Sequence, residues 1–326
     1  MRRPATILAV IATVLVIVPG WSGEERLPLL GDSPTATTAT RVALDPADPA
    51  RRRLGALTYL GGVRLDSPDP AFGGFSSLSL AGDRLTLLSD GGNLVSFRID
   101  PHGRLSRVRF AELPGGPGTG WDKRDRDSES HAVDPRTGRV WVGFERANAI
   151  WRYAPGFARA ERGVRPAAMR RWRSNGGPEA MTRLRDGRFV VIAEEATHGP
   201  GREALVFADD PTLTGEPAFR FRYLPPPGFD VSDLCELPDG RLLVVNRWWG
   251  FPLRFVNTLT TLSPAALKPG ALVRGREIAR LGAPLTHDNV EGCAAATQRG
   301  RTVIWLATDN DRMWFRPSLL FKFRLD

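Results

Sequence analysis

The chain has 326 residues, of which 42% are hydrophobic and 25% are charged, and its formal net charge is +9. The positive charge is almost entirely arginine, because lysine occurs only at positions 123, 268 and 322. The arginines are scattered and form no basic block, which argues against nucleic-acid binding and favours a general attraction for small anionic or ester substrates.

The N-terminus is predicted to be a signal peptide over residues 1–22. Arg2 and Arg3 precede an apolar run over residues 7–18, and the small residues Gly20 and Ser22 follow it. This is the order of charge, apolar centre and small residues found in secretory signals, so we expect export to the periplasm or the extracellular space. The run is short for a spanning helix, and a stable membrane span is not expected; an uncleaved N-terminal anchor is the alternative.

Residues 23–54 are rich in Pro, Thr, Ala and Asp and are predicted to be a flexible linker. Residues 55–326 are predicted to form one domain, which we expect to be a monomer. Within it, five copies of one pattern recur at intervals of roughly 50–60 residues, the range of repeats that each form one sheet. Each copy has a strand that begins at polar residues, a turn, and a second apolar strand that ends in polar or acidic residues.

Third and fourth strands are predicted to complete each copy. They are expected at 93–99 and 105–113, at 149–153 and 166–172, at 204–208 and 218–224, and at 258–262 and 277–281. The last copy has only a third strand, 319–325, so residues 57–65 are expected to supply its outer strand and close the ring. The sequence predicts an all-β fold, a β-propeller of five four-stranded blades. Six blades remain open if residues 113–126 contain a strand pair, and an open β-solenoid or sandwich is the alternative.

Acidic residues recur where the first strand of each copy begins and the second ends, which is the same end of an antiparallel pair. They are therefore expected to meet at one mouth of the central channel. The candidate metal ligands are Asp90, Glu145, Glu179, Glu194, Asp233, Asn246, Asp288 and Asp309. Close like charges need neutralising, and oxygen donors of this kind suit a hard divalent cation such as Ca²⁺. The alternative is that Arg146, Arg247 and Arg312 pair with these carboxylates as structural salt bridges.

Four further residues at the same positions are candidates for catalysis. Glu129 and Glu291 are candidate general bases. His131 and His287 are candidates for acid–base chemistry or metal ligation, with an interblade hydrogen bond as the alternative role.

Two other pairs occupy matching places in different copies. Trp141 and Trp305 each stand four residues before a candidate ligand and are predicted to pack in interblade cores. Cys235 and Cys293 are too few for a disulfide scaffold and are expected to be buried as small apolar residues, with a disulfide as the alternative.

Five segments resemble a known family. They are Phe-Gly-Gly-Phe-Ser-Ser-Leu at 72–78, Ser-Asp-Gly-Gly at 89–92, Glu-Ser-His-Ala-Val-Asp-Pro at 129–135, Gly-Pro-Glu-Ala-Met at 177–181 and Asp-Asn-Val-Glu-Gly at 288–292. Together they resemble the phytase-like group of exported β-propellers, known as "esterase-like activity of phytase". The resemblance implies hydrolysis of phosphate or carboxylic esters, with Ca²⁺ as in propeller phytases.

Two alternatives to that activity stay open. One is a lactonase-type sugar-acid hydrolase, in which Glu129 or Glu179, with Asn246 and Asp309, would hold a single divalent ion. The other is a non-catalytic binding or scaffold propeller, in which the acidic residues only join the blades. No Gly-x-Ser-x-Gly motif is present, which argues against an α/β-hydrolase esterase.

Overall fold

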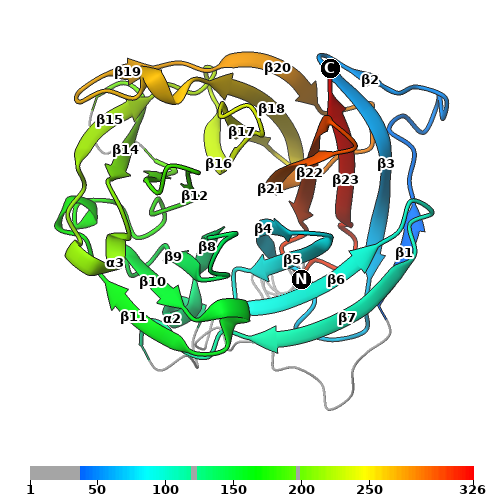
Figure 1. Cartoon of the computed structure of the whole chain (residues 1–326). Helices are drawn as coiled ribbons and strands as arrows, with labels where there is room; N and C mark the ends of the chain where they lie inside the picture. The colour runs from blue at the N-terminus through cyan, green and yellow to red at the C-terminus, as the bar shows by residue number, and fades with distance from the viewer. Residues whose placement is uncertain (1–36, 119–122, 196–198) are drawn as a thin grey trace, which may run out of the picture.

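The computed structural model describes residues 37–118, 123–195 and 199–326. Figure 1 shows five antiparallel sheets arranged as blades around a ring, with the innermost strand of each blade toward the centre. The prediction of a five-bladed all-β propeller is confirmed. The predicted signal peptide and residues 23–36 of the predicted linker lie outside the described residues.

The blades follow one another in chain order. Blade 1 contains β4 (Phe75–Ala81), β5 (Arg84–Ser89), β6 (Asn93–Ile99) and β7 (Leu105–Glu112). Blade 2 contains β8 (Ser128–Val133), β9 (Val140–Phe144), β10 (Ala149–Tyr153) and β11 (Ala160–Val164). Blade 3 contains β12 (Ala180–Arg183), β13 (Phe189–Ile192), β14 (Arg202–Phe207) and β15 (Phe219–Tyr223), with β19 (Leu272–Val273) added in parallel at its outer edge.

Blade 4 contains β16 (Asp230–Glu236), β17 (Leu242–Gly250), β18 (Arg254–Leu262) and β20 (Arg276–Leu281). Blade 5 contains β21 (Asn289–Gln298), β22 (Arg301–Asp309), β23 (Ser318–Leu325) and β3 (Leu57–Asp66). The helices among the described residues are the short segments α2 (Lys123–Arg126) and α3 (Pro211–Thr214) and the 3-10 turns η1 (Pro155–Phe157), η2 (Ala167–Met169) and η3 (Pro264–Ala266). No helix among the described residues is long and apolar enough to cross a membrane.

Blade 5 closes the ring with strands from both ends of the described chain. β23 pairs antiparallel with β3, from Ser318 opposite Leu65 to Leu325 opposite Leu57. The outer strand predicted at 57–65 is thus confirmed. Because N-terminal and C-terminal strands share one sheet, the ring has no unpaired edge where it closes.

Two sequence expectations need correction. Residues 37–54 are not an unpacked linker: β1 (Thr38–Arg41) and β2 (Arg53–Leu54) both pair with β3, and the side chain of Leu44 between them is fully buried. Leu44 and Leu54 pack into the hydrophobic core shared by blades 4 and 5, which the small and polar composition of the segment did not indicate. The fourth strand of blade 2 lies at Ala160–Val164 rather than 166–172, because Pro166 has no N–H to give to a ladder and begins the turn η2 instead.

The hydrophobic cores lie between neighbouring blades. Trp305 is 6% exposed and packs with residues of blade 1 such as Leu78 and Leu85, and Trp141 is 4% exposed and packs against Phe189 of blade 3. The predicted interblade role of both tryptophans is confirmed. Cys235 and Cys293 are buried and are not bridged.

Truncation of Trp305 is expected to destabilise the protein. Trp305→Ala removes a buried side chain at the junction of blades 5 and 1, and we expect the free energy of unfolding to fall by about 3–5 kcal/mol in urea denaturation. Trp249→Ala is the matched control, because its side chain is 56% exposed and its loss should change stability by about 0.5 kcal/mol or less. Equal effects of the two variants would contradict the assignment of Trp305 to the core.

Candidate functional site

The innermost strand of four blades carries a β-bulge at the same position. The register shifts fall between Phe75 and Ser77, between Ser128 and Ser130, between Val231 and Asp233, and between Val290 and Gly292. A bulge adds one residue and re-aims a side chain, here Ser76, Glu129, Ser232 and Glu291. Glu179 occupies the same position in blade 3, directly before the pairing of Ala180 with Ile192. We call Ser76, Glu129, Glu179, Ser232 and Glu291 the inner ring.

A second set of equivalent residues follows the neighbouring strands. In each blade, one residue of the second strand pairs with the residue that directly follows the inner-ring position. The residue two positions further along the second strand stands at the same end of the sheet as the inner ring. These residues are Asp90, Glu145, Glu194, Arg247 and Asp309, and we call them the outer ring. The rings hold seven carboxylates and one guanidinium. In blade 4 the equivalent residue is Arg247, not Asn246 as the sequence pattern indicated.

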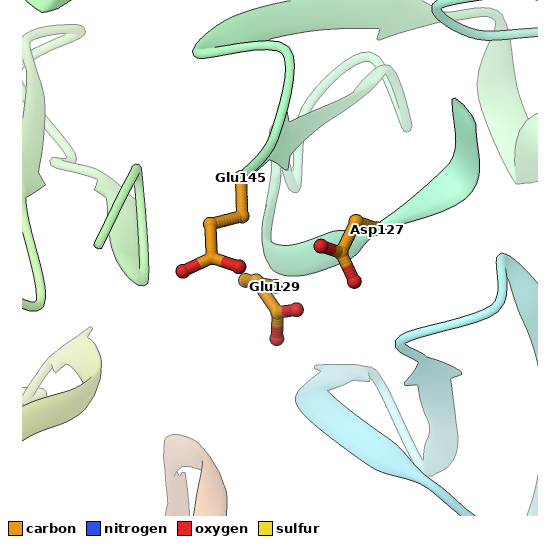
Figure 2. A group of neighbouring side chains, drawn as sticks. All are labelled: Asp127, Glu129 and Glu145. Atoms are coloured by element: carbon orange, nitrogen blue, oxygen red, sulfur yellow. The ribbon is translucent and has the colours of Figure 1, made fainter. Parts of the chain in front are cut away.

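Five carboxylates from blades 2 and 3 gather in two overlapping groups. Asp127, Glu129 and Glu145 each offer an oxygen within 4.8 Å of the other two, and the same holds for Glu145, Glu179 and Glu194. Glu145 belongs to both groups. Figure 2 shows the first group, in which Asp127 lies directly before β8, Glu129 lies near the beginning of β8 and Glu145 lies directly after β9.

Burial and mutual repulsion raise the pKa values of these carboxyls. The pKa of Glu145 rises to about 8 and that of Glu194 to about 7, in both cases mainly through burial. Asp127 adds to the shift at Glu145, whereas Arg247 opposes it at Glu194. Burial also raises the pKa values of Glu129 and Glu179 well above the usual range, with further repulsion from neighbouring carboxylates. The group therefore favours either bound protons or a bound cation.

Arg247 supplies the positive charge at this mouth from blade 4. Its guanidinium donates to Glu194 Oε1 of blade 3 at 2.5 Å and to Glu291 Oε1 of blade 5. It therefore joins three consecutive blades. No cationic side chain forms an ion pair with Glu129, Glu145 or Glu179 in the part of the chain that the structure describes.

Two further arginines form ion pairs with neighbouring carboxylates. Arg146 contacts Asp127 at 2.7 Å, and Arg312 contacts Asp90 at 3.2 Å. The alternative expectation, that Arg146, Arg247 and Arg312 pair with mouth carboxylates, is therefore correct in its geometry. It accounts for Asp127, Asp90, Glu194 and Glu291 but leaves the centre of the two carboxylate groups without a cationic partner among the described residues.

Three of the predicted ligands belong to neither of the two carboxylate groups and instead form hydrogen bonds that stabilise the fold. Asp233 Oδ2 accepts the N–H of Cys293 at 2.6 Å, across the junction of blades 4 and 5. Asn246 is fully buried, and its amide contacts the Tyr223 hydroxyl and the Thr258 carbonyl. Asp288 accepts hydrogen bonds from Arg316.

Asp309 lies near Glu291, which belongs to the same blade. Burial and repulsion from Glu291, Asp311 and Asp90 raise its pKa well above the usual range. Glu291 itself is 7% exposed and bonded to Arg247 and to the Asn289 amide, at 2.7 Å in the latter case. These residues form a second acidic side of the mouth, beyond the groups centred on Glu145.

The two predicted histidines lie away from the carboxylate groups. His131 is 5% exposed, its Nδ1 lies 2.9 Å from Ser77 Oγ of blade 1, and burial lowers its pKa to about 4. It lines a cavity of about 290 Å³ between the inner strands. His287 Nδ1 lies 2.6 Å from the Leu285 carbonyl, and the residue borders a separate cavity of about 1050 Å³.

Asp127 is the functional candidate that the sequence pattern missed. It is 3% exposed and precedes the bulged Glu129 by two residues. The spacing Asp-x-Glu at the beginning of a strand was the available signal, since alternate residues of a strand point the same way. Among the other copies only blade 4 has an acidic residue at the equivalent place, Asp230, which pairs with Arg202, so the repeat did not single Asp127 out.

A family model described as "Phytase-like: Esterase-like activity of phytase" matches residues 70–312, most of the chain. The chain belongs to the phytase-like family. Both rings of this phytase-like propeller lie inside the matched range. None of the curated proteins compared with the chain matches it.

Among solved structures, hydrazine synthase from Kuenenia stuttgartiensis is similar, with 11% sequence identity and a TM-score of 0.38. The alignment covers 74% of the present chain and 58% of that chain, so the phytase-like propeller spans a little over half the length of that relative.

Proposed function

We propose that this phytase-like propeller is a metal-assisted hydrolase of phosphate or carboxylic esters, with its site at the acidic mouth. The observation that supports the proposal is the pair of carboxylate groups that share Glu145. Their oxygens approach one another closely, they are mostly buried, and their pKa values are raised. Family membership supplies the reaction class.

The donor set fits Ca²⁺. The ion prefers six to eight oxygen ligands, and Asp127, Glu129, Glu145, Glu179 and Glu194 offer carboxylate oxygens from two adjacent blades. No His or Cys belongs to either group, which disfavours zinc. When bound, such an ion acts as a Lewis acid that polarises the oxygen atoms of an ester.

The chain's own residues would position and serve the reaction. Glu129 is partly buried on the bulge of β8 beside Asp127 and Glu145, where its carboxylate would take the proton of an attacking water. Arg247 holds Glu194 and Glu291 in fixed positions on the far side of the mouth. The burial of both groups would exclude bulk water and strengthen the electrostatic interactions there.

We also propose that the protein is exported, on the strength of the N-terminal sequence alone. The basic start and apolar run over residues 7–18 support a cleaved signal peptide. N-terminal sequencing of the protein recovered from the periplasm or medium would test this, and an intact Met1 on membrane-bound protein would identify an anchor instead.

Calcium titration of chelator-stripped protein tests the site directly. Binding must displace protons from carboxyls with raised pKa values, so we expect proton release at pH 7 that ceases when the ion saturates. Isothermal titration calorimetry in two buffers of different ionisation enthalpy measures it. Mg²⁺ and Zn²⁺ serve as comparisons. No binding by any of the three ions would reject a metal-assisted mechanism.

Substrate screening separates the proposed reaction from its alternatives. Aryl phosphates, aryl acetates and lactones should be compared with and without Ca²⁺. Hydrolysis of either of the first two, dependent on the ion, supports the proposal. Hydrolysis of lactones alone would favour the lactonase-type alternative, although Asn246 is already fully hydrogen-bonded within the protein. Calcium binding without turnover would favour a scaffold, in which the ion joins blades 2 and 3.

A further inference from the structure

A second cavity lies at the junction of blades 5 and 1, on the face of the propeller opposite the two rings. It has a volume of about 510 Å³ and is bordered by β3, β22 and β23 and by the turn between β6 and β7. β22 begins at Arg301 beside this cavity and ends at Asp309 in the outer ring, which sets the two sites at opposite ends of one strand. We call this cavity the seam pocket.

Cationic side chains dominate its lining. Arg41, Arg299, Arg301 and Lys322 border the seam pocket, and none of them forms an ion pair with any acidic residue that the structure describes. Arg324, which also lines it, is paired with Asp326 at 2.8 Å. Four unpaired positive charges around one concave surface produce a strong attraction for an anion.

The single acidic residue in the described lining, Asp100, offsets only part of this charge. Asp100 Oδ1 accepts the backbone N–H groups of His102 at 2.8 Å and Arg104 at 2.9 Å, within its own turn. These hydrogen bonds hold the pKa of Asp100 below its usual value. The hydrogen bonds of this carboxylate stay within the β6–β7 turn, and its single negative charge leaves the described lining with an excess of positive charge.

The wall of the pocket contains a buried hydrogen-bond donor without an acceptor. The Lys322 ammonium lies 4.8 Å from the centre of the Trp305 ring. Trp305 is only 6% exposed, and its indole Nε1 has no hydrogen-bond partner among the described residues. Buried donors are normally satisfied, so this N–H has an unmet requirement. Burial and the charge of Arg299 lower the pKa of Lys322, which an anion would reverse.

We propose that the seam pocket binds a small organic anion, whose phosphate or carboxylate group contacts Lys322 and the neighbouring arginines and whose apolar part lies against the pocket wall. Leu60, Ile99, Pro101 and Val303 supply that wall beside the cations. The volume is within the range of small-molecule sites, roughly 300–1,000 Å³. The proposal does not depend on the reaction at the mouth.

Calorimetric titration with phenylphosphonate, which has no ester bond to hydrolyse, tests the proposal. We expect saturable binding that weakens as salt is raised, since the attraction is between charges. Lys322→Gln should weaken it by about tenfold or more, the loss expected for a charge-assisted hydrogen bond. Benzoate in place of phenylphosphonate distinguishes a carboxylate ligand from a phosphate ligand, and either one binding supports the site.

Two controls separate this site from general charge effects and from the mouth. Lys268→Gln removes the same charge from an exposed position outside the pocket and should leave the affinity unchanged. Glu145→Gln alters the mouth and should also leave it unchanged. The proposal is overturned if neither anion binds saturably, if Lys268→Gln weakens binding as much as Lys322→Gln does, or if only Glu145→Gln changes it. Circular dichroism of each variant establishes that it is folded at the titration temperature.

Discussion

Replacing Arg247 with methionine is expected to lower the free energy of unfolding by about 3–5 kcal/mol at pH 8, the cost of leaving buried charges without their partner. The guanidinium contacts Glu194 and Glu291, whose side chains are 17% and 9% exposed. Methionine retains an unbranched apolar stem of similar reach but cannot neutralise either carboxylate. Urea denaturation measures the change.

The effect of Arg247→Met should depend on pH in a defined direction. Burial raises the pKa of Glu194 to about 7 and also raises that of Glu291, even with the arginine present. When a carboxyl has a higher pKa in the folded state than in the unfolded state, the protein loses stability as the pH rises from the lower pKa to the higher one. The deficit should therefore be smaller at pH 5, where Glu194 is largely protonated, than at pH 8.

Two further variants make this prediction specific. Arg241 forms an exposed pair with Asp239 at 2.6 Å, so Arg241→Met should cost about 1 kcal/mol or less. Adding Glu291→Gln to Arg247→Met removes one of the stranded charges and should recover part of the lost stability. A double variant that is less stable than Arg247→Met alone would show that the arginine does not act by neutralising Glu291.

Most of the fold could be predicted from the sequence because each blade repeats the same alternation of apolar strand and turn. Neither end of the domain followed that rule fully. Strand β3 was predicted because the last copy lacked an outer strand, whereas β1 was missed because no repeat required it. In blade 2, Met169 and Trp172 looked like strand residues but are buried beside a 3-10 turn that begins after Pro166.

The site was predicted less completely because its residues depend on register. A shift of one residue moves a strand side chain to the opposite face of the sheet. The pattern placed Asn246 at the mouth, but the bulge in β16 makes Arg247 the equivalent of Glu145 and Glu194. An amide ligand was thus expected where the protein has a cation.

This register difference changes the chemistry of the mouth. A ring that was entirely acidic would need neutralising on every side, whereas Arg247 neutralises the side between Glu194 and Glu291. The remaining need for neutralisation, by protons or by a cation, is then concentrated at blades 2 and 3, around Glu145. The metal site proposed above is placed there because no arginine pairs with these carboxylates among the described residues, and the sequence pattern alone did not contain that information.

Replacing Glu145 with glutamine is expected to abolish most of the stabilisation by Ca²⁺, because this carboxylate belongs to both groups. For wild-type protein, a hundredfold excess of ion over Kd should raise the free energy of unfolding by about 2.7 kcal/mol. Thermal melts of chelator-stripped protein, titrated with Ca²⁺, measure the difference. Glu195→Gln is the control, since Glu195 lies next to Glu194 in the chain but pairs with Arg173 at 2.7 Å and belongs to neither group.

Without the ion, the same variant should be more stable than the wild type at alkaline pH. The pKa of Glu145 is raised from 4.5 to about 8, so ionising this group costs the metal-free wild type stability progressively between those pH values. Glutamine has no such cost, and the two proteins should converge near pH 4. Calcium therefore reverses their order at pH 8: Glu145→Gln is the more stable protein in chelator, and the wild type is the more stable in saturating Ca²⁺. A variant that is less stable than the wild type under both conditions would show that Glu145 serves the fold and not an ion.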